Sequence, residues 1–186
     1  MSAVLVVTGP SGVGKGTLID NVRQRVPELE LSISATTRRP RPGETHGVDY
    51  WFLSDEEFER RVAAGEFVEH AAYSGRRYGT LRSELDERVQ RGVPVVLEIE
   101  LQGARQVRRT MPEAVQVFIA PPSFEVLRTR LVARGDPETM AHLDARLQTA
   151  REELAAQQEF AEVVVNDRLE DAVAALEAIV RATITP

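Results

Sequence analysis

A glycine-rich loop near the N-terminus restricts the possible folds more than any other feature of the sequence. Residues 3–8 are a continuous run dominated by apolar side chains, which predicts a strand buried on both faces of a parallel sheet. The loop Gly9-Pro-Ser-Gly-Val-Gly-Lys-Gly-Thr17 follows directly. Apolar residues then recur at helical spacing, at Leu18, Ile19, Val22 and Val26. Strand, glycine loop and helix in this order predict the opening of an α/β fold.

The loop has the spacing Gly-x4-Gly-Lys, which favours phosphate binding. Glycines let successive backbone N–H groups converge on one point, the following helix adds its positive end, and Lys15 would reach the β- and γ-phosphates. The alternative is a strand-to-helix turn without a ligand. Gly16 stands where Ser or Thr usually serves Mg²⁺, and Thr17 comes one residue later, so it could serve a phosphate or, through water, the metal. We assign the whole loop to a phosphate-binding site that consists of Gly9, Pro10, Ser11, Gly12, Val13, Gly14, Lys15, Gly16 and Thr17.

Composition narrows the classes of protein that remain. With 186 residues and a net charge of −6, the chain is a poor general binder of nucleic acid, which requires a positive surface. It has no cysteine, which excludes disulfides, thiol nucleophiles and cysteine zinc sites and favours a reducing compartment. No apolar run approaches the ~18 residues of a membrane span, and the N-terminus lacks a basic secretion signal. These observations predict a cytoplasmic protein. Of its 23 basic residues only Lys15 is a lysine.

The rest of the chain alternates strand and helix patterns. Residues 32–50 are polar, arginine-rich and punctuated by proline, so we predict that they lie outside the core. Ser54-Asp-Glu-Glu57 is a capping box that opens a short helix ending at Gly65. Further strands are predicted at residues 67–73, 78–81, 93–101, 116–120 and 163–165. Four further helices are predicted. The first ends at Gly92, and the second runs from Ser123 toward Arg134. The third carries Leu143, Leu147 and Leu154, and the fourth carries Leu169 to Val180.

Several motifs in this order resemble the guanylate kinase family. They are the glycine loop, Ser34-Ala-Thr-Thr-Arg38-Arg-Pro-Arg41-Pro-Gly-Glu44, Gly47-Val-Asp-Tyr50, Phe67-Val-Glu69, Tyr78-Gly-Thr80, Leu97-Glu-Ile-Glu-Leu-Gln-Gly103, Phe118-Ile-Ala-Pro-Pro122 and Val165-Asn-Asp167. The resemblance implies an α/β phosphate-loop core with a parallel sheet flanked by helices, formed by residues 1–32, 90–123 and 151–186. It further implies a GMP-binding subdomain at 33–89 and a helical lid at 124–150. The implied reaction transfers the γ-phosphoryl group of ATP to GMP, and to dGMP, with Mg²⁺ as cofactor.

The resemblance also assigns the acceptor site. It places the GMP phosphate among Arg38, Arg41, Tyr50 and Tyr78, whose guanidinium and phenol groups can saturate a dianion. It places the base against Glu69, with Ser34 and Thr80, because an ionised carboxylate matches the N1–H and amino donors of guanine but not the N1 acceptor of adenine. The alternative for the Arg38–Arg41 segment is a basic loop that is only solvated. The alternative for Glu69 is an exposed residue of a strand. Arg39 receives no role and is predicted to face solvent.

Glu98 and Glu100 alternate with Leu97 and Ile99, so both carboxylates are predicted to project from one face at the end of a strand. In doubly wound sheets this end opens on the ligand crevice. The resemblance assigns Glu98 to the acceptor nucleotide and Glu100 to water molecules on Mg²⁺, although the family commonly has Asp at both positions. For Glu100 the equal alternative is a carboxylate that only caps neighbouring N–H groups.

Three arginines resemble those of the family's lid. Arg130 and Arg134 precede the Gly135 loop, and Arg146 lies on the next predicted helix. Together with Lys15 and Arg38, the residues Arg134 and Arg146 would neutralise charge during transfer, and Arg130, Arg134 and Asn166 would contact ATP. Ion pairs on exposed helices are the alternative for each arginine. His142 is predicted to be a surface residue.

Two rival functions remain at this stage. A kinase for AMP or a pyrimidine nucleotide would share the loop, and Glu69 argues against it. A peptide-binding module without catalysis would be expected to have an eroded phosphate loop, whereas Gly14 and Lys15 are present here.

Overall fold

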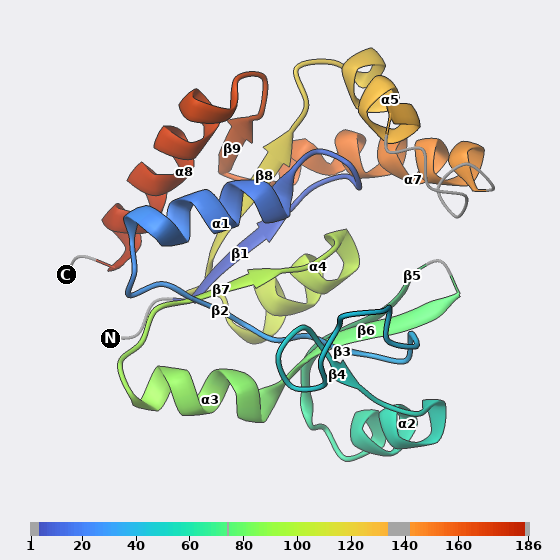
Figure 1. Cartoon of the computed structure of the whole chain (residues 1–186). Coiled ribbons are helices and arrows are strands. Elements are labelled where there is room, and N and C mark those ends of the chain that lie inside the picture. Colours follow the sequence, from blue (N-terminus) through green and yellow to red (C-terminus); the bar gives the residue numbers. More distant parts are fainter. Residues whose placement is uncertain (1–3, 74, 134–141, 185–186) are drawn as a thin grey trace. The chain divides into compact units, whose positions relative to one another are not determined.

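The computed structural model describes residues 4–73, 75–133 and 142–184, which form two compact units (Figure 1). One unit comprises the described residues up to Val6 together with Glu28–Val115, and the other comprises Val7–Pro27 and the residues from Gln116 onward. Strand β1 (Val4–Thr8) contributes to both units. All five of its residues are buried, as the unbroken apolar run predicts.

The first unit contains two sets of strands. Its elements are β2 (Glu30–Leu31), β3 (Ala35–Thr36), β4 (Trp51–Phe52), α2 (Asp55–Ala63), β5 (Phe67–Tyr73), β6 (Arg76–Leu81), α3 (Arg82–Gln90), β7 (Val95–Glu98) and α4 (Leu101–Thr110). β2 pairs with β7 in parallel, whereas β4-β3-β6-β5 form a separate four-stranded sheet. In that sheet β6 pairs antiparallel with both β3 and β5.

Helix α2 closes a small core over the four-stranded sheet. The Phe58 ring lies 4.5 Å from the Phe67 ring, centroid to centroid, and both side chains are buried with Ala35 and Leu81. Trp51 and several other partly buried apolar side chains pack around this cluster. Burial of large aromatic side chains supplies most of the stability of such a core.

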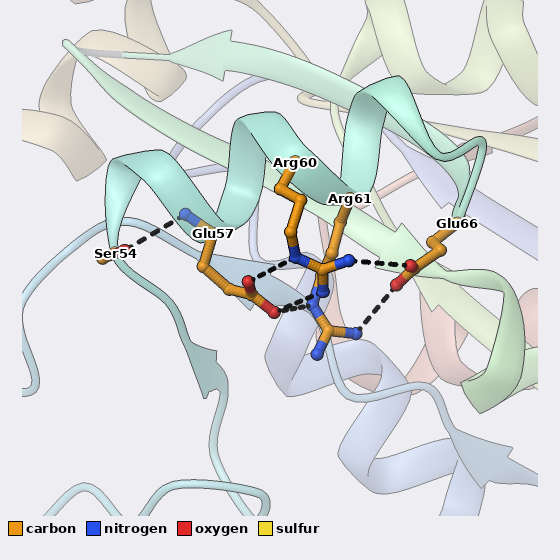
Figure 2. Close-up of polar contacts among 5 residues, drawn as sticks. All are labelled: Ser54, Glu57, Arg60, Arg61 and Glu66. Atoms are coloured by element: carbon orange, nitrogen blue, oxygen red, sulfur yellow. Dashed lines mark hydrogen bonds and ion pairs between the residues drawn. The ribbon is translucent and has the colours of Figure 1, made fainter.

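The start of α2 is fixed by its capping residue, as the sequence predicts. The backbone N–H of Glu57 donates to the Ser54 hydroxyl at 3.1 Å (Figure 2). The Glu57 carboxylate then accepts from Arg60 and Arg61, and both guanidinium groups also reach Glu66. These ion pairs lie at the surface, where such pairs contribute little. The cap and the burial of Phe58 therefore matter more for this helix.

Replacing Ser54 with Ala is expected to lower the free energy of unfolding by about 1 kcal/mol, because the first turn of α2 loses the acceptor for one of its N–H groups. Urea denaturation of the purified variant measures this change. Ser83→Ala is the matched control, since Ser83 is an exposed residue inside α3. Equal effects of the two substitutions would contradict the capping role.

The second unit completes the larger sheet. Its further elements are α1 (Lys15–Arg25), β8 (Val115–Ala120), α5 (Phe124–Ala133), α7 (Leu143–Ala155), the 3₁₀ turn η1 (Ala156–Glu159), β9 (Glu162–Val165) and α8 (Leu169–Ile184). The sheet has the strand order β2-β7-β1-β8-β9, and β8 pairs with β9 in parallel. Helices α1 and α8 lie side by side. The predicted α/β class, with a parallel sheet flanked by helices, is confirmed.

Two predictions about local structure are wrong. The strand predicted at 93–101 ends at Glu98, and Leu101 begins helix α4, which the sequence analysis missed. The prediction that residues 32–50 lie outside the core fails for its first part. Ala35 and Thr36 are fully buried, because β3 lies between β4 and β6 and the Thr36 hydroxyl is satisfied by the carbonyl of Arg77. Arg39 and His142 are exposed, as predicted.

Among the residues that the structure describes, no helix combines the length and apolar character needed to cross a membrane.

Candidate functional site

The glycine loop of the second unit has the geometry that its sequence requires. Gly9 and Gly14 have φ values of 137° and 97°, which L-residues with side chains rarely adopt. A Cβ on Gly9 would collide with the backbone oxygen of Ile119, and a Cβ on Gly14 would lie 2.7 Å from the Asn166 amide nitrogen. Gly14 also caps α1, whose N-terminal N–H groups follow the loop. The backbone and its surroundings therefore both require glycine here.

Lys15 and Asn166 tie the loop together from its two ends. The Lys15 ammonium donates to the carbonyls of Gly9 and Pro10 at 2.6 and 3.2 Å. The buried Asn166 amide donates to the carbonyl of Val13 at 2.8 Å. These contacts hold the curvature of the loop.

Two of the predicted lid arginines also reach this region within the second unit. Arg146 of α7 donates to the Ser11 hydroxyl at 2.6 Å, and Arg130 of α5 donates to the backbone carbonyl of Asn166 at 2.9 Å. Thr17 is exposed on α1, and Arg134 lies outside the described residues.

Arg38 of the first unit is held in place by Glu44. The two guanidinium nitrogens donate to the two carboxylate oxygens at 2.9 and 2.8 Å, and Glu44 also accepts from the backbone N–H of Arg41 at 2.7 Å. These hydrogen bonds, from Arg38 first and then from Arg41, lower the pKa of Glu44 to about 2. The same ion pair raises the pKa of Arg38. Both groups are therefore charged across the physiological pH range.

Two tyrosines lie next to Arg38. Its guanidinium carbon is 5.2 Å from the centroid of the Tyr50 ring, and the Tyr50 and Tyr78 rings are 6.4 Å apart. Burial raises the pKa of Tyr50, with smaller contributions from Tyr78 and Glu98. The Tyr50 phenol therefore carries a proton at neutral pH and can donate a hydrogen bond.

Glu69 owes its direction to an irregularity in β5. Phe67 pairs with Leu81, but the register shifts so that Glu69 pairs with Thr80. Directly paired residues share a face of the sheet and neighbours along a strand do not, so this bulge turns Glu69 away from the face of Phe67. In a regular strand the carboxylate would enter the apolar core under α2. The bulge instead places it beside the Thr80 hydroxyl.

The Glu69 carboxylate is buried and its charge is only partly compensated. It is 3% exposed, and the Thr80 hydroxyl donates to its Oε1 at 2.8 Å. Burial raises the pKa of Glu69 to about 7; hydrogen bonds from Thr80 lower it and the charge of Glu100 raises it further. A buried carboxylate whose pKa lies near neutrality is a candidate functional group.

Tyr78 and Thr80 bring these two clusters onto one face of the sheet. They are two residues apart on β6, so their side chains leave on the same side, about 7 Å apart along the strand. Gly79 between them faces the opposite side, where a Cβ would lie 2.7 Å from the Phe67 ring. The Arg38–Tyr50–Tyr78 cluster and the Glu69–Thr80 pair are therefore neighbours along a single strand.

The remaining predicted acceptor residues take different positions. Ser34 precedes β3, and its carbonyl accepts from the backbone N–H of Trp51. Arg41 is an exposed residue in the loop closed by Glu44. Glu98 is half-buried at the end of β7, whereas Glu100 lies beyond the strand. Only Glu98 therefore belongs to the strand, and the projection of both carboxylates from one face stays a prediction.

Glu100 acts as the N-cap of α4. Its two carboxylate oxygens accept from the backbone N–H groups of Gln102 and Gly103, at 2.9 and 2.6 Å. This is the capping arrangement that the sequence analysis kept as the alternative to a role near Mg²⁺. No group of three or more potential metal ligands occurs among the residues that the structure describes.

The sequence predicts no role for Glu44 or Gly103, although both lie within the motifs that resemble the guanylate kinase family. The signal for Glu44 is an acid embedded in an arginine-rich loop, which indicates an ion pair but not which arginine it binds. Nothing in the sequence indicates why residue 103 is a glycine, because the reason is the close approach of the Glu69 carboxylate in the folded protein.

Comparisons with known proteins show the family to which the chain belongs. The family described as "Guanylate kinase" matches residues 1–183. The guanylate kinase of Frankia casuarinae is 57% identical over 176 residues, covering 94% of this chain and 94% of its own length. That of Synechococcus sp. (strain CC9311) is 53% identical over 180 residues, covering 97% and 94%. The crystal structure of guanylate kinase from Anaplasma phagocytophilum superposes with a TM-score of 0.78 at 34% identity, over 100% of this chain and 87% of that one. Since the match extends over nearly the whole length at this identity, the chain belongs to the guanylate kinase family.

Proposed function

We propose that this chain transfers the γ-phosphoryl group of ATP to GMP, and to dGMP, and releases ADP and GDP or dGDP. The observation that carries the proposal is the buried Glu69 carboxylate, whose Oε1 accepts a hydrogen bond from the Thr80 hydroxyl at 2.8 Å. This carboxylate lies on the same sheet as the Arg38–Tyr50–Tyr78 cluster. An ionised carboxylate accepts from two adjacent donors, which guanine presents and adenine does not. Its place of action would be the cytoplasm, where ATP is available.

The acceptor phosphate would bind Arg38, Arg41, Tyr50 and Tyr78. Glu44 supports this assignment, because it holds the Arg38 fork in a fixed orientation before the phosphate arrives. The base would lie against Glu69 and Thr80, with Ser34 and Glu98 completing the acceptor site. The spacing of Tyr78 and Thr80 along β6 suits a ligand with a phosphate at one end and a base at the other.

The donor phosphates would bind the loop Gly9–Thr17 and the N-terminus of α1. Lys15 would exchange its bonds to the carbonyls of Gly9 and Pro10 for bonds to phosphate oxygens. Arg130, Arg146 and Asn166 would contact ATP, since their hydrogen bonds already lie at or beside the loop. Arg134 would join them, and residues 124–150 would form the lid.

The proposed division of the chain follows from these roles. Residues 33–89 would hold GMP, and they include the four-stranded sheet with Glu69 and Tyr78. Residues 1–32, 90–123 and 151–186 would form the phosphate-loop core.

The transfer needs no protein nucleophile and no general base, because the attacking phosphate oxygen is already anionic. The chain would contribute orientation and positive charge: Lys15, Arg38, Arg134 and Arg146 would stabilise the charge that spreads over the migrating group. Exclusion of water would prevent hydrolysis of ATP.

Mg²⁺ would enter with the triphosphate and neutralise part of its charge. The donors here fit a metal held by phosphates and water, with Thr17 as a water-mediated contact, since Glu100 is committed to the cap of α4.

An ADP-release assay tests the proposal directly. ATP is offered with GMP, dGMP, AMP, UMP or dTMP, and the value of kcat/KM is compared among them. We expect GMP to be preferred to AMP by about 10⁴-fold, because a site built on buried polar pairing rejects a mismatched base strongly. Faster turnover of AMP than of GMP would contradict the proposal.

Acidification is expected to weaken GMP binding. With a pKa of about 7, Glu69 is mostly ionised at pH 8 and mostly protonated at pH 6, and only the ionised form offers two acceptors to guanine. Thr80 on β6 and Glu100 before α4 are the groups that set this pKa together with burial. The KM for GMP should therefore rise roughly tenfold from pH 8 to pH 6, since the binding-competent fraction falls by that factor.

Glu69→Gln provides the control for this pH dependence, because it retains the titration of the GMP phosphate and lacks that of the carboxyl group. The KM for ATP, measured in the same series, should show no matching step. A KM for GMP that changes with pH equally in the two proteins would mean that Glu69 does not bind the base as a carboxylate.

A further inference from the structure

Helix α4 lies against the strand that carries Glu69. A Cβ on Gly103 would overlap the Oε2 atom of Glu69 and would come within 3.1 Å of its carboxyl carbon. Side chains essentially never approach this closely, so the Glu69 carboxylate occupies the space that any other residue at position 103 would need. The helix surface at Gly103 is thus one wall around the carboxylate.

The backbone of α4 does not itself require a glycine at this position. Gly103 is the third residue of the helix and is absent from the glycines with positive φ. In a helix interior, glycine is less stable than alanine by about 1 kcal/mol. The close approach of Glu69 is therefore the physical reason that accounts for Gly103.

A second residue of α4 fixes the backbone next to Glu69. The Gln106 amide donates to the carbonyl of His70 at 2.7 Å, and its Oε1 accepts from the N–H of His70 at 3.2 Å. β5 is the edge strand of its sheet, so these backbone groups face away from β6 and have no strand partner there. The Gln106 amide thus takes the place of a neighbouring strand as the hydrogen-bond partner of the His70 backbone, directly after Glu69.

α4 holds Glu69 by shape rather than by charge. Its first free N–H groups, those of Gln102 and Gly103, donate to Glu100 and are not available to Glu69. The charge of Glu100 also adds to the cost of ionising Glu69. The Thr80 hydroxyl donates to Oε1, and an ionised carboxylate has further acceptor positions for an incoming ligand.

We propose that Gly103 and Gln106 are positioning residues that aim the Glu69 carboxylate and thereby determine the preference for guanine. Gly103 leaves room for the carboxylate, and the Gln106 amide locks the adjacent peptide. This inference rests on the proposed role of Glu69 as the residue that reads the base.

The first test measures kcat and KM for GMP and AMP in Gly103→Ala and Gln106→Ala. A carboxylate displaced by about 1 Å loses alignment with the purine donors, and we expect Gly103→Ala to lower the ratio of kcat/KM for GMP over AMP by about tenfold to a hundredfold. The loss should appear mainly in the KM for GMP, with the KM for ATP unchanged. Gln106→Ala should shift the ratio in the same direction, by about threefold to tenfold.

Gln102→Ala is the matched control for Gln106→Ala, because it makes the same change at an exposed position of the same helix. The ratio in this control should stay within about twofold of the parent value. Unchanged ratios in both test variants, or an equal fall in the control, would overturn the proposal.

A double-mutant cycle separates positioning from a general structural effect. In a Glu69→Ala background the space beside Gly103 is empty, so adding Gly103→Ala should cost no further selectivity. The same loss in both backgrounds would overturn the proposal. If Gly103→Ala does not fold, as thermal melting would reveal, the cycle is run with Gln106→Ala, whose lost hydrogen bonds lie at an exposed edge that water can reach.

The parent protein distinguishes this inference from the proposed function. A parent protein that does not phosphorylate GMP would refute both. A parent that prefers GMP, together with variants that retain this preference, would refute only the positioning roles of Gly103 and Gln106.

Discussion

Replacing Lys15 with Ala is expected to lower kcat by roughly a thousandfold while leaving the fold intact. Removal of one preorganised donor to developing charge costs about 10²- to 10³-fold in enzymes, and Lys15 would be the cation nearest the transferred group. The Lys15 ammonium donates to the carbonyls of Gly9 and Pro10, both within the glycine loop, and we expect the strand and helix on either side to keep their structure in the variant. Steady-state kinetics with GMP and ATP measures the effect.

Arg23→Ala is the control for this substitution. Arg23 is a cation on the same helix, whose ion pair with Asp20 has a separation of 3.9 Å at the surface. Its removal should leave kcat within about twofold, because exposed pairs of this kind contribute little. Near-normal activity of Lys15→Ala would show that the loop does not hold ATP.

The second large effect is expected for Glu69→Gln, which should lower kcat/KM for GMP by about 10²-fold or more. Gln keeps the size of the side chain but replaces one acceptor with a donor, which would then face a donor of guanine and leave both unsatisfied in a buried site. The preference for GMP over AMP should weaken by a similar factor. Assays with both nucleotides measure this, and an unchanged preference would exclude Glu69 as the residue that reads the base.

The same variant should be more stable than the parent at alkaline pH. The Glu69 carboxyl ionises near 4.5 in the unfolded chain and near 7 in the folded protein, so between these values only the folded state holds the proton. The stability of the parent therefore falls as the pH rises through this window. Gln has no proton to lose, so the variant should gain about 2.5 kcal/mol relative to the parent between pH 5 and pH 8. Urea denaturation at the two pH values serves as the folding control.

Local chemistry made the glycine loop predictable. The glycines, the single lysine and the flanking strand and helix patterns are contiguous, so Gly9–Thr17 could be assigned to one loop before its shape was known. The same is true of the α2 cap at Ser54, because its partner is only three residues away. Helix α4 was missed although its buried apolar residues Leu101, Ala104 and Val107 recur at helical spacing, because Leu101 was assigned to the preceding strand.

The amino-acid sequence by itself determined the α/β class and the glycine loop, because these depend on periodicity and on neighbours along the chain, whereas the predicted acceptor residues followed only from the resemblance to guanylate kinases. Only the tertiary structure decided which way Glu69 points and what surrounds it. The bulge in β5, the Glu44 partner of Arg38 and the Gly103 wall all arise from pairings across strands or between a helix and a strand. A one-residue shift of register moves a side chain to the opposite face of a sheet, and no local pattern of residues records that shift.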